Sequence, residues 1–373
     1  MIILIVTHPL GNNYGGLLQA YALQHFLRSM GHDPWILNIP RDTLKIKALR
    51  FLRNLMFKLT GRFYVTEEEK GAISKYTSYF AQNYIIPQTP VLKSNREIRC
   101  FIKKHNIKAL VVGSDQVWRP RYVNNIYHFF LDFSQSLHVK RLSYAASFGV
   151  DEWEFSLGQT VKCKKLLDKF DSISVREDSG IVLCKEFFGR DAQMVLDPTL
   201  LLDRKHYSEL VIKEREAPVN GELFCYVLDK SEAKKELITN LSIQIGYRPC
   251  YCMPEEVDYS RMNRHNKDLF VYPPVTRWIR SVMDSKMVLT DSFHGCVFSI
   301  LFNRPFWVLI NNKRGSTRFK SLLRLFGLEE RILSNKDIES MDWKSEIDWK
   351  KVNAILEQWR EKSIVFLQEC LSE

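Results

Sequence analysis

The residue types best suited to chemistry in this chain lie in one short stretch, residues 290–295 (Thr-Asp-Ser-Phe-His-Gly). The stretch follows the apolar run 287–289 and precedes a second apolar run, 296–302. This order predicts a strand, a tight polar turn and a helix. The first turn of a helix offers unpaired N–H groups and the positive end of the dipole, so we expect His294 and Gly295 beside an anionic ligand. The alternative for His294 is a buried structural histidine.

A second group of cations lies in residues 311–318 (Asn-Asn-Lys-Arg-Gly-Ser-Thr-Arg), after an expected strand at 306–310. Lys313, Arg314 and Arg318 would lie at a strand end, just before a helix that starts near Thr317. This arrangement predicts a cradle for an anion. A solvated loop is the alternative.

One further arginine follows a buried strand directly. Arg176 comes directly after residues 173–175 (Ile-Ser-Val), where a guanidinium fork can clamp a phosphate or a carboxylate. The alternative role for Arg176 is structural, as the partner of Glu177 or Asp178 in an ion pair.

A carboxylate and an indole follow the expected strand 108–112. Asp115 at that strand end can accept a proton from a sugar hydroxyl, and Trp118 can stack on a sugar face. A helix N-cap is an equally weighted alternative for Asp115.

The glycine-rich turn 11–16 (Gly-Asn-Asn-Tyr-Gly-Gly) joins the expected strand 2–6 to a helix that ends at Gly31. Its glycines permit close approach of the backbone to a ligand. The turn lacks both the G-x-G-x-x-G spacing and the Walker Lys-Ser/Thr, so neither a dinucleotide nor an NTP fingerprint is present. A plain strand–helix turn is the alternative.

Strands and helices alternate along the whole chain, which predicts an α/β fold with parallel sheets and helices on both faces. The carboxyl ends of such strands are where α/β sheets bind ligands. We expect an N-terminal Rossmann-like domain at 1–203, on the acceptor side, and a C-terminal one at 204–345, on the donor side. An amphipathic helix within 346–373 is expected to pack back on the N-terminal domain.

Composition narrows the class of protein. The 373 residues carry 54 Lys+Arg against 43 Asp+Glu, a net charge of +11 that favours acidic partners. No nucleic-acid-binding motif is present, so we expect no nucleic-acid partner.

Eight scattered cysteines are typical of a reduced cytosolic protein, and no zinc spacing is found, so we expect no metal site. With no secretory signal and no apolar run of transmembrane length, we expect a cytoplasmic protein.

Residues 41–62 hold seven of the basic residues and one acid, with apolar residues at helical spacing. The pattern predicts a basic amphipathic helix. A surface helix packed on its own domain is one interpretation, and a peripheral contact with the inner face of a membrane is the other.

Six short segments, in this order, resemble the polysaccharide pyruvyl transferase family. They are residues 13–23 (Asn-Tyr-Gly-Gly-Leu-Leu-Gln-Ala-Tyr-Ala-Leu), 113–118 (Gly-Ser-Asp-Gln-Val-Trp), 143–149 (Ser-Tyr-Ala-Ala-Ser-Phe-Gly), 174–177 (Ser-Val-Arg-Glu), 196–199 (Leu-Asp-Pro-Thr) and 290–295. The resemblance implies a GT-B-like fold, with two Rossmann-like domains facing a central cleft. It also implies phosphoenolpyruvate as donor, no other cofactor, and a saccharide hydroxyl pair as acceptor.

Matched residue by residue, the resemblance implies that Arg176 and His294 contact the donor. The family often has an arginine two positions before this histidine, where this chain has Ser292. Lys313, Arg314 or Arg318 would then supply the missing charge. The acceptor side is expected to use Asn13, Tyr14, Gly15, Gln19, Gln116 and Trp118.

The hypothesis from sequence is therefore an enzyme of bacterial cell-surface polysaccharide biosynthesis that forms a pyruvate ketal. His294 is the candidate acid and Asp115 the candidate base, with Asp291 second. The basic helix at 41–62 would suit a lipid-linked acceptor. The rival interpretations are a GT-B glycosyltransferase that uses a nucleotide sugar, and a non-catalytic saccharide-binding protein.

Overall fold

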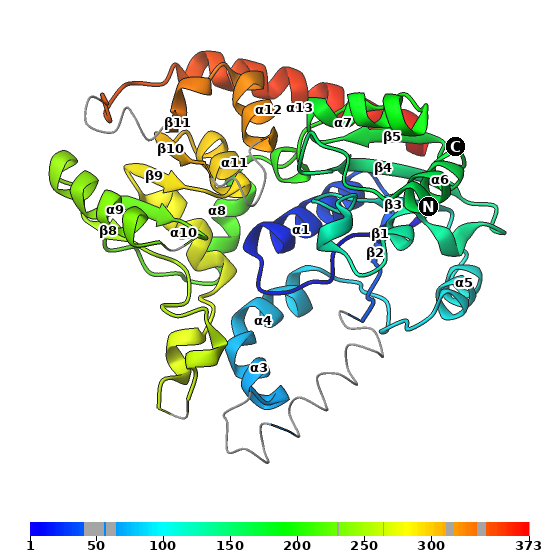
Figure 1. Ribbon diagram of the computed structural model, residues 1–373, viewed down its shortest axis with the longest axis horizontal. Coiled ribbons are helices and arrows are strands. Elements are labelled where there is room, and N and C mark those ends of the chain that lie inside the picture. The colour runs from blue at the N-terminus through cyan, green and yellow to red at the C-terminus, as the bar shows by residue number, and fades with distance from the viewer. Residues whose placement is uncertain are drawn as a thin grey trace.

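Two parallel β-sheets, each flanked by helices, form the two lobes of the protein (Figure 1). The computed structural model describes residues 1–40, 56, 65–229, 231–263, 265–310, 317–333 and 341–372. The segment 41–62, expected to be a basic amphipathic helix, therefore lies outside the described residues apart from Met56, as do Lys313 and Arg314.

The N-terminal lobe is built on a six-stranded sheet in which every pair is parallel. In sheet order its strands are β2 (Asp33–Ile36), β1 (Ile2–Val6), β3 (Ala109–Val112), β4 (Lys140–Ala146), β5 (Ser172–Val175) and β6 (Gln193–Met194). The central strands are short apolar runs buried on both faces, as parallel sheets require. Their connecting helices are α1 (Tyr14–Ser29), α3 (Glu67–Ile73), α4 (Lys75–Tyr84), α5 (Asn95–Lys104), α6 (Leu157–Leu167) and α7 (Asp178–Leu183).

The C-terminal lobe holds a five-stranded parallel sheet. In sheet order its strands are β11 (Ile332–Leu333), β10 (Phe306–Leu309), β9 (Met287–Thr290), β7 (Leu223–Tyr226) and β8 (Pro249–Cys250). Its helices are α8 (Arg204–Lys213), α9 (Glu232–Ile245), α10 (Val275–Asp284), α11 (Phe293–Leu301) and α12 (Thr317–Phe326). The expected boundary at 203/204 falls directly before α8, which packs against α10.

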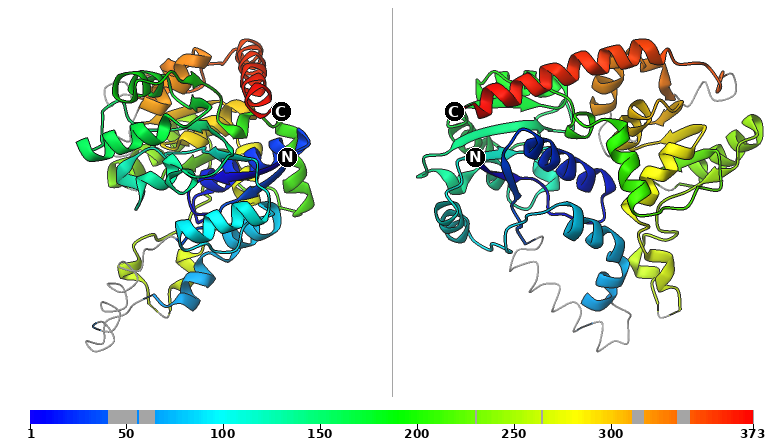
Figure 2. Two further views of the ribbon diagram at one scale, coloured as in Figure 1. Left: turned by 90° about the vertical axis from the view of Figure 1, so that its right-hand side faces the viewer. Right: turned by 180° about the vertical axis from the view of Figure 1, so that it is seen from behind.

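The last helix, α13 (Trp349–Leu371), crosses from the C-terminal lobe to the N-terminal lobe (Figure 2). It contacts α12 in one lobe and β4 in the other. Ser363 Oγ accepts a hydrogen bond from the backbone N–H of Leu196 at 3.0 Å, and Arg360 Nε donates to the carbonyl of Leu200 at 2.8 Å. The helix thus ties the two lobes together on one face.

The lobes also share one apolar core where they meet. The Tyr14 ring at the start of α1 stacks on Trp278 of α10, with ring centroids 6.1 Å apart. Its hydroxyl donates to the carbonyl of Pro273 at 2.9 Å. Such contacts between large buried aromatic rings hold the lobes in one relative position.

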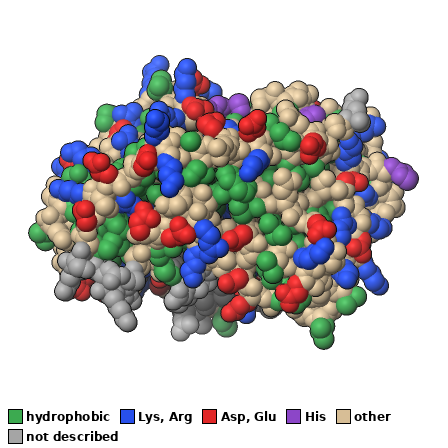
Figure 3. Space-filling model, turned by 90° about the horizontal axis from the view of Figure 1, so that it is seen from above, with side chains coloured by type: hydrophobic (Ala, Val, Ile, Leu, Met, Phe, Trp, Pro, Cys, Tyr) green, Lys and Arg blue, Asp and Glu red, His purple; other side chains and the backbone are tan. Residues whose placement is uncertain are grey.

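The surface is charged and mixed. On the face seen from above, Lys and Arg side chains are interspersed with Asp and Glu (Figure 3). No helix among the described residues is long and apolar enough to cross a membrane.

The expected α/β class with two parallel sheets is confirmed, and most expected elements agree within a few residues. Residues 67–83, expected as one helix, form α3 and α4, which meet at Ser74. The helix after the 290–295 stretch begins at Phe293, so His294 and Gly295 lie in its first turn, as expected.

Candidate active site

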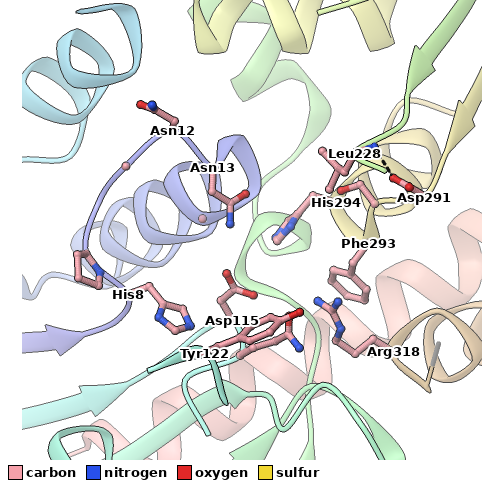
Figure 4. A pocket seen from close by; sticks show the side chains of 15 residues that line it. His8, Asn12, Asn13, Asp115, Tyr122, Leu228, Asp291, Phe293, His294 and Arg318 are labelled. Carbon is pink, nitrogen blue, oxygen red and sulfur yellow. Dashed lines mark hydrogen bonds between the residues drawn. The ribbon is translucent and has the colours of Figure 1, made fainter. Parts of the chain in front are cut away.

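A cavity of about 470 Å³ lies between the two lobes. Its walls come from the carboxyl ends of strands in both sheets and from the turn before α1 (Figure 4). It is lined by His8, Pro9, Gly11, Asn12, Asn13, Gly16, Asp115, Gln116, Tyr122, Leu228, Asp291, Ser292, Phe293, His294 and Arg318. This is the position at which doubly wound α/β sheets bind ligands.

His294 contacts the other lobe at Gly15. A Cβ on Gly15 would lie 2.0 Å from His294 Nδ1, so no larger residue fits there without moving the imidazole. Gly15 is in the first turn of α1 and His294 in the first turn of α11. The amino ends of two helices therefore approach the same place, one from each lobe, and both favour negative charge.

A buried ion network supports the base of the cavity. Arg176 donates from Nη1 to Asp197 Oδ2 at 2.9 Å and from Nη2 to Asp115 Oδ1 at 3.3 Å. His294 Nε2 lies 3.6 Å from the same oxygen of Asp197. One carboxylate thus touches both the arginine expected to bind donor and the histidine of the other lobe.

The network keeps both carboxylates ionised. Burial raises the pKa of Asp115, but the nearby charges of Arg176, His8 and His294 outweigh it and bring this pKa to about 2. Burial likewise opposes ionisation of Asp197, and the charges of His294 and Arg176 again prevail, so its pKa lies well below the usual range. An opposite charge at hydrogen-bonding distance is a strong reason for such shifts.

Among the described residues, Arg318 is the arginine that lines the cavity, and Arg176 does not belong to its lining. Both guanidinium groups contact the Phe293 ring, with Arg176 Cζ 4.3 Å and Arg318 Cζ 5.7 Å from its centroid. Burial and then the charge of Arg176 lower the pKa of Arg318 to about 10, so the group stays charged at neutral pH. The expectation that Arg176 itself faces the donor is not met in this structure, because its side chain is 1% exposed and bound to two carboxylates.

Asp291 lines the cavity but directs its carboxylate into the protein. It accepts hydrogen bonds from the backbone N–H groups of Leu228 at 2.6 Å and Asp229 at 3.0 Å, and from Lys234 Nζ at 2.8 Å. Its side chain is fully buried. This geometry suits anchoring of the β7–α9 loop better than proton transfer.

Gly295 has a packing reason for its identity. A Cβ there would lie 2.2 Å from Thr290 Oγ1, which itself donates to the carbonyl of Tyr226 at 2.7 Å. The start of α11 can therefore lie close against the end of β9 only with glycine at this position.

Asp115 has a left-handed backbone conformation, with φ of 74°. Its carboxylate bonds to Arg176, so the N-cap alternative does not describe it. Left-handed conformations in residues other than glycine cost energy and cluster at functional sites. Gln116 also lines the cavity, and a Cβ on Gly149 would lie 1.8 Å from its Nε2, so glycine makes room for this amide.

Three of the residues expected to bind acceptor are core residues, which corrects that expectation. Trp118 is fully buried, donates from Nε1 to the carbonyl of Phe129 at 3.0 Å and stacks on Phe130. Gln19 is fully buried and accepts from the backbone N–H of Ser114 at 2.9 Å. Tyr14 belongs to the interlobe core described above. None of these three has a face that a sugar can reach.

The structure also places residues in the site to which the sequence patterns gave no role. They are His8, Tyr122 and Leu228 in the cavity wall and Asp197 beneath it. His8 follows β1 by two residues, so its position at a strand end was a usable signal. Asp197 lies in the Leu-Asp-Pro-Thr segment, but its ion partners are distant in sequence.

Comparisons with known proteins agree on family and fold. A family model described as polysaccharide pyruvyl transferase matches residues 13–313. No curated protein matches the chain.

Solved structures resemble the chain along nearly its whole length. The UDP-GlcNAc 2-epimerase of Methanocaldococcus jannaschii, in complex with UDP-GlcNAc and UDP, has a TM-score of 0.54 at 12% identity, over 99% of each chain. Arabidopsis thaliana UGT89C1, complexed with UDP-L-rhamnose, has a TM-score of 0.51 at 9% identity, over 99% of this chain and 95% of its own. At such identities these GT-B proteins show that the fold is GT-B, and nothing more.

Proposed function

Because the chain belongs to the polysaccharide pyruvyl transferase family, we propose that it moves the enolpyruvyl group of phosphoenolpyruvate onto two hydroxyls of a saccharide. The product is a cyclic pyruvate ketal of a cell-surface polysaccharide or its precursor. The observation that carries this proposal is the interlobe cavity at the amino ends of α1 and α11, where His294 and Arg318 lie with the Asp115 carboxylate.

The reaction balances as a transfer with loss of phosphate. The methylene carbon of phosphoenolpyruvate takes one proton and becomes a methyl group, while C2 becomes electrophilic. One sugar oxygen bonds to C2 and loses its proton, and the C2–O bond to phosphate breaks. The second sugar oxygen then bonds to C2 and loses its proton, which closes the ring. Of the two protons released, one balances the methyl group and the other leaves on phosphate.

Donor binding needs positive charge, and the cavity provides it from three directions. Arg318 offers a charged guanidinium, His294 an imidazole and the amino ends of α1 and α11 their N–H groups. His8 lies on the opposite wall, at the end of β1. These groups suit the phosphate and the carboxylate of phosphoenolpyruvate.

Proton transfer falls to His294 and Asp115. We assign His294 as the acid, because its imidazole lines the cavity and its Nε2 lies 3.6 Å from Asp197 Oδ2. Asp115 is the base for a sugar hydroxyl. The low pKa of Asp115 would rise once the anionic donor binds beside it. Asp197 and Arg176 are positioning residues in this scheme, which needs no metal.

Phosphate release from phosphoenolpyruvate in the presence of a glycan panel tests the proposal. We expect turnover by the wild type and by His138→Ala, a control at an exposed histidine, and a large loss in His294→Ala. Turnover that His294→Ala leaves unchanged would refute the site.

The rival glycosyltransferase would bind a nucleotide sugar instead. Thermal stabilisation by UDP- or GDP-sugars but not by phosphoenolpyruvate would favour it. A protein that binds glycan and neither donor would be a saccharide-binding protein without catalysis.

A further inference from the structure

A second, smaller cavity of about 180 Å³ adjoins the candidate active site. The two cavities share Pro9 and Gly11 as wall residues. From this shared wall the smaller cavity extends over α4 and the residues that follow β2, all in the N-terminal lobe. It therefore leads away from Arg318, which lies on the donor side.

The wall between the cavities is fixed by a hydrogen bond. Thr77 Oγ1, in the smaller cavity, donates to Asn12 Oδ1 at 2.7 Å. Asn12 belongs to the lining of the larger cavity, and its side chain points away from Asp115 (Figure 4). The turn before α1 thus contributes wall residues to both cavities, and its hydrogen bond to α4 fixes the position of one cavity relative to the other.

The polar groups of the smaller cavity are amides and hydroxyls. Asn38, Ser78 and Gln82 line it, and their side chains make no hydrogen bond within the described part of the chain. Gln88 is held in place because its Nε2 donates to the carbonyls of Ala81 at 2.7 Å and Ile85 at 2.9 Å. Amides and hydroxyls both donate and accept, which matches the hydroxyls of a sugar.

The two cavities differ in charge. Among the described residues that line the smaller cavity, none is Asp, Glu, Lys, Arg or His. The larger cavity holds Arg318, two histidines and two aspartates. A site without charged groups does not compensate the desolvation of an ionised ligand, so the smaller cavity favours an uncharged one.

We propose that the smaller cavity binds the uncharged sugar unit next to the one that receives the pyruvyl group. The inference rests on the proposed function and makes the acceptor at least a disaccharide. The terminal sugar lies against Asp115, and its neighbour reaches Ser78 and Gln82 past Pro9 and Gly11. Binding of this second unit raises kcat/KM for disaccharides over the matching monosaccharide.

The test uses methyl glycosides of neutral disaccharides, each paired with the methyl glycoside of its accepting monosaccharide, with phosphate release from phosphoenolpyruvate as readout. For pairs that turn over, we expect kcat/KM about tenfold higher for the disaccharide, which corresponds to about 1.4 kcal/mol. Ser78→Trp should fill the cavity and abolish this gain, and Gln82→Ala should reduce it, while monosaccharide turnover stays the same. A disaccharide with a uronic acid as the second unit should lose the gain in the wild type.

Asn83→Trp is the matched control, because Asn83 is an exposed residue of α4 outside the cavity lining. It should keep the disaccharide gain. Equal use of disaccharide and monosaccharide by the wild type, or a gain that survives both Ser78→Trp and Gln82→Ala, would overturn the subsite and leave the proposed function standing. Absence of phosphate release with every glycoside would instead overturn the proposed function, and the subsite with it.

Discussion

The imidazole of His294 occupies the space that a side chain on Gly15 would need. A Cβ at Gly15 would lie 2.0 Å from Nδ1, well inside any van der Waals contact. The two residues are on helices of different lobes, α1 and α11. Their contact therefore limits how closely the lobes approach. The position of the proposed acid, His294, depends on glycine at position 15 in the other lobe.

Gly15→Ala should move His294 and reduce kcat by about 100-fold, because a displacement of about 1 Å at a catalytic group costs that much. Steady-state phosphate release measures the effect. Gly158→Ala is the control, since Gly158 is also helical and has open space around its Cβ position. That control should keep full activity and gain about 0.5–1 kcal/mol of stability. Equal activity of both variants would show that His294 is not held by this contact.

Arg318→Gln should weaken phosphoenolpyruvate binding by about 10- to 100-fold, because it removes the guanidinium that lines the cavity. Isothermal titration with phosphoenolpyruvate measures the dissociation constant. Arg324→Gln lies on the same helix, α12, with a side chain that is 64% exposed, and should bind the donor like the wild type. Unchanged binding by the Arg318→Gln variant would remove this residue from the donor site.

The stability of the wild type relative to Asp115→Asn should depend on pH. The folded-state pKa of Asp115 is about 2, below the ordinary value of 3.8. Ionised Asp115 therefore stabilises the fold above the unfolded-state pKa, and this stabilisation is lost as the pH falls through 2. The advantage over the variant should shrink by about 2 kcal/mol between pH 5 and pH 2.

Urea unfolding across that pH range measures the difference between the wild type and the Asp115→Asn variant. Asp191→Asn serves as control, because its side chain is 89% exposed, and its difference from the wild type should stay nearly flat. A flat difference for Asp115→Asn as well would mean that Arg176 does not stabilise the Asp115 carboxylate.

The strand ends were the predictable part of this site. Parallel strands carry their carboxyl ends to one edge of a sheet, so Asp115 and Arg176 could be expected together. The 290–295 turn follows a strand of the second sheet, and it joins them because the two sheets face one cleft. The apolar runs that mark the strands are unambiguous because parallel strands are buried on both faces. His294 follows from the same argument, since it comes just after β9.

The direction of each side chain could not be predicted in the same way. Asp291 and His294 are three residues apart, yet the carboxylate turns to the backbone of Leu228 and the imidazole turns to Gly15. Asp197 meets Arg176 only because the folded sheet brings residues 21 positions apart into contact. Long-range pairing of this kind leaves no periodic signal in one sequence.

Trp118 and Tyr122 offer a test of which aromatic residue meets the acceptor. Trp118→Phe should lower the free energy of unfolding by about 2–4 kcal/mol, because it leaves a void in the core and removes the bond to Phe129. It should leave KM for the acceptor unchanged. Tyr122→Ala should show the opposite pattern, with a raised KM and little loss of stability, because Tyr122 lines the cavity and is 46% exposed. Urea unfolding and steady-state kinetics separate the two effects, and a raised KM in Trp118→Phe alone would restore the indole as the sugar contact.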